Sequence, residues 1–425
     1  MTVKEQAHNM KLASALFAAT KADLRNSALE NIKKSLEREK EAIFEANKID
    51  LKNAEDNNIS QAIVKRLKFD EKKLKDTLEG IDHLISLPDP IGKIFFEREL
   101  DTDLVLKKVS CPIGVIGVIF EARPDALVQI SSLCIKSGNC AILKGGKETA
   151  NTNSALFEVI KKAAIEAGLP ENCLFQAESH AEIDELLKCD KDVDLLIPRG
   201  SNAFVRHIMD NTKIPVMGHA DGICHIYIDK EADFEKTLKV VRDAKTQYTA
   251  ACNAVETLLV NRQTAKDILP LLAENLKDVA INGTKEVCSF IKAAPMDDED
   301  FRREYLNLEI SVKIVEDIDE AIEHINKFGS HHTDAIITEN IQSAEYFMDR
   351  VDSAGVYLNC STRFADGFRY GFGAEVGIST SKIHARGPVG LDGLMTYKYK
   401  LYGKGQIVAD YAEGRSSFKF KDISK

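Results

Sequence analysis

The stretch Pro112-Ile-Gly-Val-Ile-Gly-Val-Ile-Phe120 decides the fold of this chain. It carries no charged or hydrogen-bonding side chain, so both faces of an extended strand here would be apolar. A strand of this kind is typical of the centre of a parallel sheet covered by helices on each side. We therefore expect a central parallel strand at residues 112–120 and an α/β fold around it.

Strands and helices are expected to alternate after this strand. We expect a helix at 125–137, a strand at 141–144, a helix at 151–167, a strand at 173–176, a helix at 180–188, a strand at 194–197, a helix at 202–211, and strands at Val216 and 224–228. Such β–α units predict a doubly wound sheet with ligands at the carboxyl ends of its strands.

The two ends of this region extend the pattern. The second half is expected to hold a strand at 255–261, a helix at 264–276, a short strand near 278–281, a helix at 284–291, a strand at 312–315 and a helix at 317–327. Residues 1–87 read as helical, with a last helix at 71–87. An apolar stripe at helical spacing is formed by Leu29, Ile32, Leu36 and Ile43.

Two further segments alternate with the period of a half-exposed strand. One holds Leu100, Thr102, Leu104 and Leu106, with residues 94–97 as a candidate hairpin partner, and the other is 395–402. A lone hairpin is marginally stable, so it needs a partner sheet. We expect the two segments to form one oligomerisation arm.

The composition indicates which kinds of protein this chain could be. The 425 residues are 44% hydrophobic and 29% charged, with a net charge of −10, which is ordinary for a soluble globular chain of two or three domains. The negative charge argues against nucleic acid or an anionic membrane as the main partner. Without a signal-peptide pattern or a long apolar run, and with nine scattered cysteines, we expect reduced thiols and a cytoplasmic protein. No cysteine or histidine spacing indicates a metal.

Two strand ends could bind phosphate, although no Gly-x-Gly-x-x-Gly follows a predicted strand. Lys144-Gly-Gly-Lys147 places two cations in a flexible turn, and Arg199-Gly200-Ser201 places a cation before a helix start. Each turn alone could be merely solvated. Two of them on neighbouring units favour a nucleotide, and for a dinucleotide the two lysines would suit a 2′-phosphate.

Cys252 is one candidate nucleophile among nine cysteines, and a small buried core residue is the alternative at this point. It lies among small residues just before an apolar run, and a thiol at such a junction can be rigid and still open to substrate. Its own N–H and Asn253 could donate hydrogen bonds to an oxyanion. No histidine adjoins it, so a Cys–His pair would need His219 or His332. Glu256 could be structural or an acid/base.

Several segments together resemble one family. They are Phe120-Glu-Ala-Arg-Pro-Asp125, Ala251-Cys-Asn-Ala-Val-Glu-Thr257, residues 315–334, Asn359-Cys-Ser-Thr-Arg-Phe364 and residues 371–388. They closely resemble the γ-glutamyl phosphate reductases (glutamate-5-semialdehyde dehydrogenases) of the aldehyde dehydrogenase superfamily, over nearly the whole chain.

The resemblance implies an aldehyde dehydrogenase-like α/β fold. It implies a Rossmann-like cofactor domain at 1–92, 110–225 and 360–394, a catalytic α/β domain at 226–359, and a β-hairpin oligomerisation arm at 93–109 and 395–425. It further implies Cys252 as nucleophile and NADPH/NADP⁺ as cofactor, with Lys144 near the adenosine ribose and Ser201 near the pyrophosphate. Glu304 would face the nicotinamide ribose, with a plain surface glutamate as the alternative.

The implied substrate, L-glutamate 5-phosphate, presents a carboxylate and a phosphate, which suit arginine. Arg123, Arg363 and Arg386 lie in the matching segments, and Arg363 with Ser361 and Thr362 is the first candidate for the α-carboxylate. For Arg386, an interface salt bridge is the alternative.

Two departures from the family patterns matter. Asp125 stands where the family often has asparagine, so we do not assign it as an oxyanion donor. Hydrolytic aldehyde dehydrogenases carry a glutamate base in a segment comparable with residues 216–222, which hold no glutamate here. Water is then poorly activated against a thioester.

The expected function is NADPH-dependent reduction of L-glutamate 5-phosphate to the 5-semialdehyde in proline biosynthesis, through a thioester on Cys252. We expect a homo-oligomer, dimer or tetramer, and glutamate 5-kinase is a candidate partner. The alternatives are a hydrolytic NAD-dependent aldehyde dehydrogenase and a catalytically silent nucleotide-binding assembly module.

Overall fold

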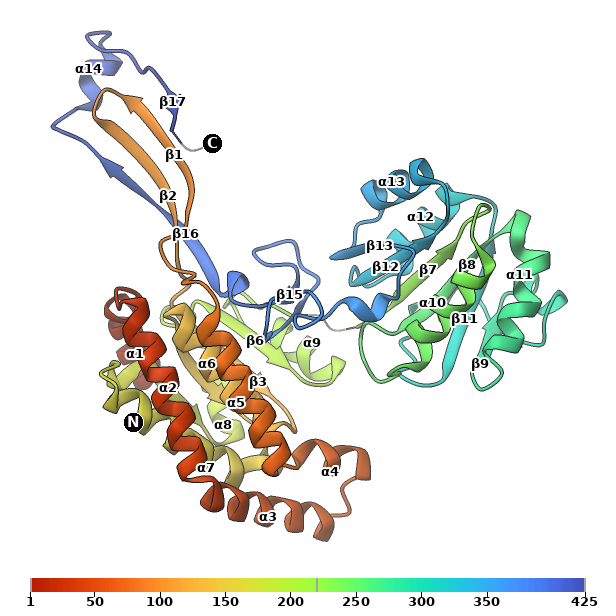
Figure 1. Ribbon diagram of the computed structural model, residues 1–425, viewed down its shortest axis with the longest axis horizontal. Helices are drawn as coiled ribbons and strands as arrows, with labels where there is room; N and C mark the ends of the chain where they lie inside the picture. The colour runs from red at the N-terminus through yellow and green to blue at the C-terminus, as the bar shows by residue number, and fades with distance from the viewer. Residues whose placement is uncertain (1, 219–220, 424–425) are drawn as a thin grey trace.

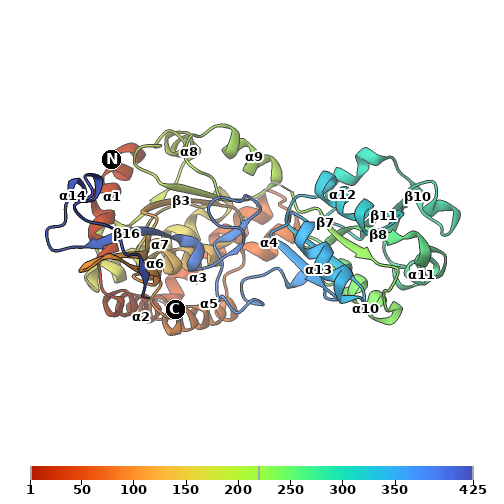
Figure 2. The ribbon, with the colours of Figure 1, turned by 90° about the horizontal axis from the view of Figure 1, so that it is seen from above.

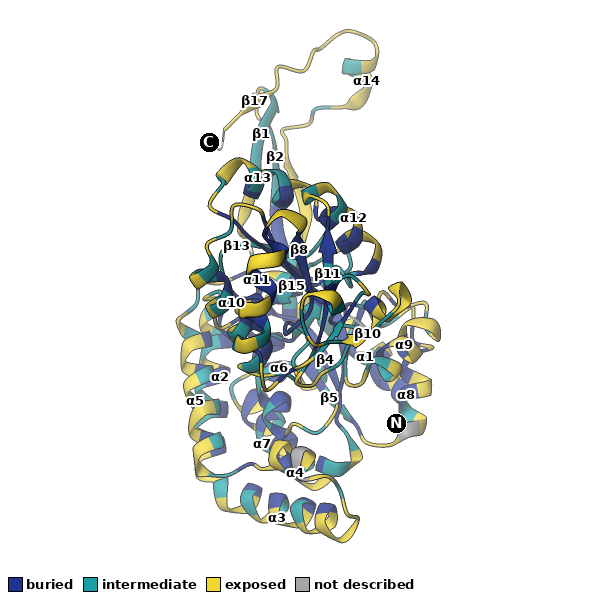
Figure 3. Ribbon diagram, turned by 90° about the vertical axis from the view of Figure 1, so that its right-hand side faces the viewer, coloured by how far each residue is buried: buried dark blue, intermediate teal, exposed yellow. Residues whose placement is uncertain are grey.

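The computed structural model describes residues 2–218 and 221–423. The chain forms two α/β bodies that lie side by side, and an antiparallel arm that extends from the first body (Figures 1 and 2). Buried residues concentrate in the sheets of both bodies, whereas helices such as α3 and α5 turn exposed residues outward (Figure 3).

The first body is organised around the strand that the sequence predicts. Its sheet has the order β5-β4-β3-β6, and β3 pairs in parallel with β4 and β6. All six residues of β3 are buried, as expected for a central strand. The strands are β3 (Val115–Phe120), β4 (Cys140–Lys144), β5 (Leu174–Ala177) and β6 (Leu195–Arg199). The expected strand at Val216 is only an isolated bridge to Leu196.

Helices surround this sheet. They are α1 (Val3–Ala18), α2 (Ala22–Arg38), α3 (Lys40–Asp56), α4 (Gln61–Leu67), α5 (Glu71–Ser86), α6 (Pro124–Ser137), α7 (Ala150–Glu166), α8 (His180–Leu186) and α9 (Asn202–Asp210). The apolar stripe of residues 29–43 is fully buried but belongs to two helices, because the chain turns at Glu39 between α2 and α3.

The second body contains a seven-stranded sheet with the order β10-β9-β11-β8-β7-β12-β13. The strands are β7 (Cys224–Ile228), β8 (Val255–Asn261), β9 (Ala280–Gly283), β10 (Ala294–Pro295), β11 (Glu309–Val315), β12 (Thr333–Ile337) and β13 (Gly355–Leu358). The helices are α10 (Phe234–Thr246), α11 (Arg262–Asn275), α12 (Ile318–Phe328) and α13 (Ile341–Arg350). The expected helix at 284–291 is wrong. Only the 3-10 turn Val287–Ser289 forms, because the short connection from β9 to β10 leaves no room for more.

The arm pairs an internal hairpin with the C-terminal strands of the chain. Its sheet has the order β16-β2-β1-β17, with β1 (Ile94–Asp101), β2 (Leu104–Pro112), β16 (Met395–Tyr402) and β17 (Lys421–Asp422). The alternating run 100–106 is not one strand, because the chain turns between β1 and β2, where Asp103 has a φ of 58°. The residues of β16 beyond Met395 are exposed. An oligomeric role of the arm stays a prediction.

After the second body, the chain returns to the first through the short strands β14 (Gly377–Ser379) and β15 (Gly387–Val389). Gly377 packs against β6, because a Cβ there would lie at an ordinary contact distance of 3.5 Å from Ile197. The two bodies are therefore linked twice, once before β7 and once after β13.

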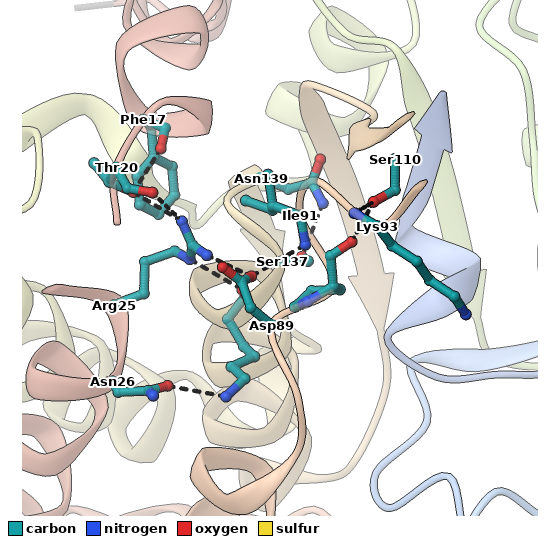
Figure 4. Close-up of polar contacts among 12 residues, drawn as sticks. Phe17, Thr20, Arg25, Asn26, Asp89, Ile91, Lys93, Ser110, Ser137 and Asn139 are labelled. Carbon is teal, nitrogen blue, oxygen red and sulfur yellow. Dashed lines mark hydrogen bonds and ion pairs between the residues drawn. The ribbon is translucent and has the colours of Figure 1, made fainter. Parts of the chain in front are cut away.

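A buried polar network fixes the base of the arm (Figure 4). The Arg25 guanidinium donates to the Thr20 carbonyl, to the Lys136 carbonyl at 3.2 Å and to Asp89 Oδ1 at 2.6 Å. Asp89 Oδ1 also accepts the Ile91 N–H at 3.0 Å. Because Arg25 is only 1% exposed, it joins α2, the end of α6 and the entry to the arm in one buried unit.

Replacing Arg25 with leucine would remove the donor to the Thr20 and Lys136 carbonyls and would leave the part-buried Asp89 carboxylate without its cation. We expect Arg25→Leu to lower the free energy of unfolding by about 3 kcal/mol, measured by urea denaturation. Arg38→Leu is the matched control on the same helix, because that side chain is 61% exposed and pairs only at the surface, where a pair contributes about 0–1 kcal/mol. Equal losses in the two variants would contradict the network.

His324 lies in an aromatic cluster of the second body. Its ring is 4.7 Å from the rings of both Phe301 and Phe328, 3% of the residue is exposed, and neither ring nitrogen has a hydrogen-bond partner. Burial, with a smaller effect of His225, lowers the pKa of His324 to about 2. The ring therefore stays neutral in the folded protein.

The lowered pKa of His324 makes stability depend on pH. The unfolded chain binds a proton at His324 below about pH 6.5, whereas the folded chain does not, so this contribution is present above that pH and is lost as pH falls. Relative to His324→Phe, the wild-type free energy of unfolding should fall by about 2 kcal/mol between pH 7 and pH 5, measured by urea denaturation. Parallel pH profiles would contradict this.

Candidate active site

The amino ends of three neighbouring strands carry the candidate site. In the second sheet the strands run β8-β7-β12 side by side and in parallel. The segments just before them, 252–254, 221–223 and 330–332, therefore converge. The expectation that ligands bind at the carboxyl ends of the strands concerns the sheet of the first body. In the second body, Cys252 lies instead at the amino end of its strand.

The half-buried Cys252 contacts a histidine from another strand. His332 Nε2 lies 3.1 Å from Cys252 Sγ, and His332 Nδ1 lies 3.0 Å from Thr333 Oγ1. His332 is 1% exposed, so its ring is held by packing as well. A thiol at this distance from an imidazole can pass its proton to it. Of the two histidines left open by the sequence, His219 lies outside the described residues.

Contacts with Gly222 and Cys224 hold the loop around Cys252 in place. A Cβ at Gly222 would stand 2.3 Å from the Cys252 carbonyl oxygen and 2.5 Å from its Cβ, so only glycine fits there. Cys224 Sγ donates to the Cys252 carbonyl at 3.3 Å, and burial raises the pKa of Cys224 well above its usual range. Cys224 is therefore a neutral thiol that supports the loop.

The predicted substrate residues form a strap over the same loop. Thr362 Oγ1 donates to the Asn253 carbonyl at 2.7 Å, and Asn253 Nδ2 donates to the Ala365 carbonyl at 2.8 Å. The Asn253 amide is thus engaged with the strap. Ser361 Oγ accepts the Arg363 N–H at 3.3 Å, which starts the short turn Thr362–Phe364.

Arg363 extends from this strap to Gln247 and the ring of Tyr248. It is 8% exposed, and its Nε donates to Gln247 Oε1 at 2.9 Å. Burial and the charge of Arg369 lower the pKa of Arg363, whereas the Cys252 charge acts in the opposite direction. A buried cation therefore lies within electrostatic reach of the sulfur.

Glu304 bridges the two bodies. Its Oε1 accepts the Gly222 N–H at 3.0 Å, and its Oε2 accepts from Asn202 Nδ2 at 2.7 Å. Asn202 is the first residue of α9 and directly follows Gly200 and Ser201. Both carboxylate oxygens of Glu304 are thus held between the Cys252 loop and the predicted pyrophosphate turn.

The other predicted turn closes around acidic residues. Lys144 is 3% exposed and donates to the Gly145 carbonyl, and burial lowers its pKa. A Cβ at Gly146 would stand 2.1 Å from Glu148 Oε1, which accepts the Ala122 N–H at 2.7 Å. Lys147 lies at the start of the 3-10 turn Lys147–Thr149.

Two predicted residues are placed apart from these contacts. The Arg386 guanidinium pairs with Asp352 Oδ1 and its carbonyl, both at 3.0 Å. Glu256 forms a fully buried pair with Lys245 at 2.7 Å and accepts the Leu306 N–H at 3.3 Å, and burial raises its pKa to about 7. Glu256 therefore supports the turn after Glu304.

Sequence reasoning gave no role to Gly222, Cys224, Asn202 and Gln247. Each of them acts through a contact with a segment that is distant in the sequence, and a single sequence does not reveal such contacts. Among the described residues, no group of three or more potential ligands is placed to hold a metal. Within the same part of the chain, no helix is both long and apolar enough to cross a bilayer.

Comparison with known proteins gives a consistent answer. The sequence model of the aldehyde dehydrogenase family matches residues 1–298. The γ-glutamyl phosphate reductase of Acetivibrio thermocellus is 55% identical over 100% of this chain and 99% of its own length. The crystal structure of γ-glutamyl phosphate reductase from Thermotoga maritima is 36% identical, has a TM-score of 0.93 and covers 96% of this chain and 100% of that one. The corresponding Saccharomyces cerevisiae structure is 38% identical, with a TM-score of 0.55 and coverage of 97% and 100%. The chain therefore belongs to the aldehyde dehydrogenase family and, within it, to the γ-glutamyl phosphate reductases.

Proposed function

We propose that this chain reduces L-glutamate 5-phosphate to L-glutamate 5-semialdehyde with NADPH and releases phosphate, a step of proline biosynthesis in the cytoplasm. The observation that carries the proposal is the 3.1 Å contact between Cys252 Sγ and His332 Nε2 in a chain whose full-length relatives bear the name of this reductase.

Cys252 acts as the nucleophile in this proposal. His332 takes the thiol proton, the sulfur attacks the acyl carbon, and the bond from that carbon to the phosphate oxygen breaks. The backbone N–H of Cys252 is the first candidate donor to the oxyanion. Gly222 and Cys224 fix the loop, so this N–H keeps its position during the reaction. The Asn253 side chain positions the loop through Ala365.

A nicotinamide cofactor belongs to this family, and the residues of the first body fit one. Ser201 makes no side-chain cap, so the first N–H groups of α9 are available to a pyrophosphate. Lys144 and Lys147 flank a glycine turn at the end of β4, which supports a 2′-phosphate and so NADPH. Bound NADPH supplies the hydride that reduces the thioester. Glu304, beside Asn202, is placed to accept from a ribose hydroxyl.

The strap supplies the recognition of the amino-acid end. Arg363 is buried, and only its Nε is used by Gln247, so its remaining N–H groups can bind the α-carboxylate. Thr362 and Ser361 hold the strap in place. Arg386, paired with Asp352, acts as a structural link rather than in binding.

The arm is the proposed contact between protomers. Its strand β16 exposes Tyr397, Tyr399, Leu401 and Tyr402, at 49%, 59%, 57% and 52%. Solvent-exposed aromatic residues on an antiparallel sheet favour association with a second copy. Glutamate 5-kinase, which makes the labile acyl phosphate, is a proposed partner.

Semialdehyde oxidation with NADP⁺ tests this function. Steady-state NADPH formation should require phosphate, and Cys252→Ala should abolish it while NADPH still binds, as followed by cofactor fluorescence. Turnover without phosphate would favour the hydrolytic alternative, and a wild-type protein with no turnover would favour a silent assembly module. Retained turnover in Cys252→Ala would overturn the mechanism.

Removing the His332 imidazole should slow formation of the thiolate. We expect His332→Asn to reduce turnover about 10²–10⁴-fold and to move the pH–rate profile to higher pH. Alkylation of Cys252 by iodoacetamide should slow in parallel, which reports the thiolate without substrate. The control is His331→Asn, since asparagine tolerates the positive φ of 60° at that position. Unchanged alkylation in His332→Asn would contradict the assignment.

A further inference from the structure

We propose that Arg199 and Arg123 form the subsite for the phosphate group of the acyl phosphate. The inference rests on the proposed function, and it moves Arg199 from the cofactor, where the sequence placed it, to the substrate. It also divides the anionic ends of the substrate between two arginine groups, with Arg363 at the other end.

The backbone places the two arginines at one sheet edge. β3 and β6 are neighbouring parallel strands, with Phe120 opposite Arg199, and the Glu121 N–H donates to the Arg199 carbonyl at 3.2 Å. Arg123 follows three residues after Phe120, as the N-cap of α6, in extended conformation before Pro124. Both side chains therefore start from rigid positions at the carboxyl ends of adjacent strands.

Arg199 has hydrogen-bonding capacity that the protein does not use. Its Nη1 is buried without a partner, and among residues 2–218 and 221–423 neither Arg199 nor Arg123 has an ion pair within 4 Å. A buried donor without an acceptor costs about 1–3 kcal/mol, which a ligand oxygen can recover. The fork of a guanidinium matches a phosphate in geometry and charge.

Each acidic residue near Arg199 has an oxygen engaged by another group, although Asp125 Oδ1, within the part of the chain that the structure describes, is buried without a hydrogen-bond partner. Asp125 Oδ2 lies 3.0 Å from Lys73 Nζ, and Glu375 Oε2 accepts the Gly367 N–H at 2.9 Å. Burial and the charge of Arg123 lower the pKa of Arg199, while the charges of Glu375, Asp125 and Cys252 act against this. A bound phosphate would add negative charge beside the two cations and offer an acceptor to the unpartnered Arg199 Nη1.

The charges around the two strand-end turns separate their roles. The charges that act on the Arg199 guanidinium include those of Arg123 and Cys252. The charges that act on Lys144 are instead those of Glu148 and Glu182, which oppose the lowering of its pKa by burial. A phosphate bonded to the acyl carbon must lie next to the sulfur, whereas a 2′-phosphate must lie far from the nicotinamide. Arg199 fits the first of these positions and Lys144 the second.

The subsite acts at one covalent step. In the oxidative direction, HPO₄²⁻ attacks the thioester carbon on Cys252, a C–O bond forms, the C–S bond breaks, and the phosphate proton passes through His332 to the sulfur. The products are the acyl phosphate and the Cys252 thiol, so atoms and charge balance. Arg199 and Arg123 concentrate and orient the phosphate for this attack.

Pre-steady-state oxidation of the semialdehyde separates this step from the earlier ones. Without phosphate, wild-type enzyme should form one NADPH per site in a burst, and phosphate should then start steady turnover. Arg199→Gln should keep the burst but raise the KM for phosphate about 10–100-fold. Arg123→Gln should act in the same direction. Arg199→Lys, which keeps the charge but loses the fork, should fall between.

Two control variants separate an effect on phosphate binding from other effects. Arg363→Gln should raise the KM for the semialdehyde, and Arg262→Gln, at an exposed pair with Glu286 and Glu316, should leave all constants unchanged. Two results with Arg199→Gln would overturn the proposal. The first is weaker binding of NADP⁺ at an unchanged KM for phosphate, and the second is loss of the burst in a protein that circular dichroism shows to be folded. A KM for phosphate that rises only in Arg363→Gln would also overturn it. A wild-type enzyme without a burst would instead refute the proposed function.

Discussion

The parallel pairing of β8, β7 and β12 is the constraint on which the site depends. Because these three strands are neighbours in register, the residues before them meet at one edge, although Cys252 and His332 are 80 positions apart in the chain. The hydrogen bonds of the sheet thus fix the separation of sulfur and imidazole. Gly222, just before the middle strand, and Cys224, its first residue, then leave the loop no room to shift.

In the proposed mechanism, the second body supplies the Cys252 sulfur, and the first body supplies charges and helix N–H groups. Glu304 joins the two, since it accepts hydrogen bonds from Gly222 next to the sulfur and from Asn202 at the start of α9. A ribose hydroxyl at Glu304 would have to compete with these donors. Cofactor binding and the contact between the two bodies therefore depend on the same carboxylate.

Sequence reasoning succeeded where the information is local. The apolar run of β3 is fully buried, and the stripe of residues 29–43 is in the core, because periodicity follows directly from burial on one or both faces. It was wrong at 284–291 and within 100–106, where the lengths of connections and a turn decide the structure. Cys252 was found through family resemblance, whereas its contact with His332 depends on strand order, which left two histidines open.

The charges around Cys252 bear on which nucleophile can resolve its thioester. Hydrolysis needs a carboxylate free to take a proton from water, but both oxygens of Glu304 already accept hydrogen bonds, and Glu256 is paired with Lys245 in the core. By contrast, the Cys252 charge acts on both Arg199 and Arg363. Arg199 Nη1 has no partner among the described residues, and the Arg363 side chain donates from its Nε to Gln247. An environment of this kind lowers the free energy of an arriving anion and does nothing to activate neutral water. The balance of charge at the site therefore supports the proposal that phosphate, rather than water, is the acyl acceptor. The same cations would attract the acyl phosphate in the reductive direction.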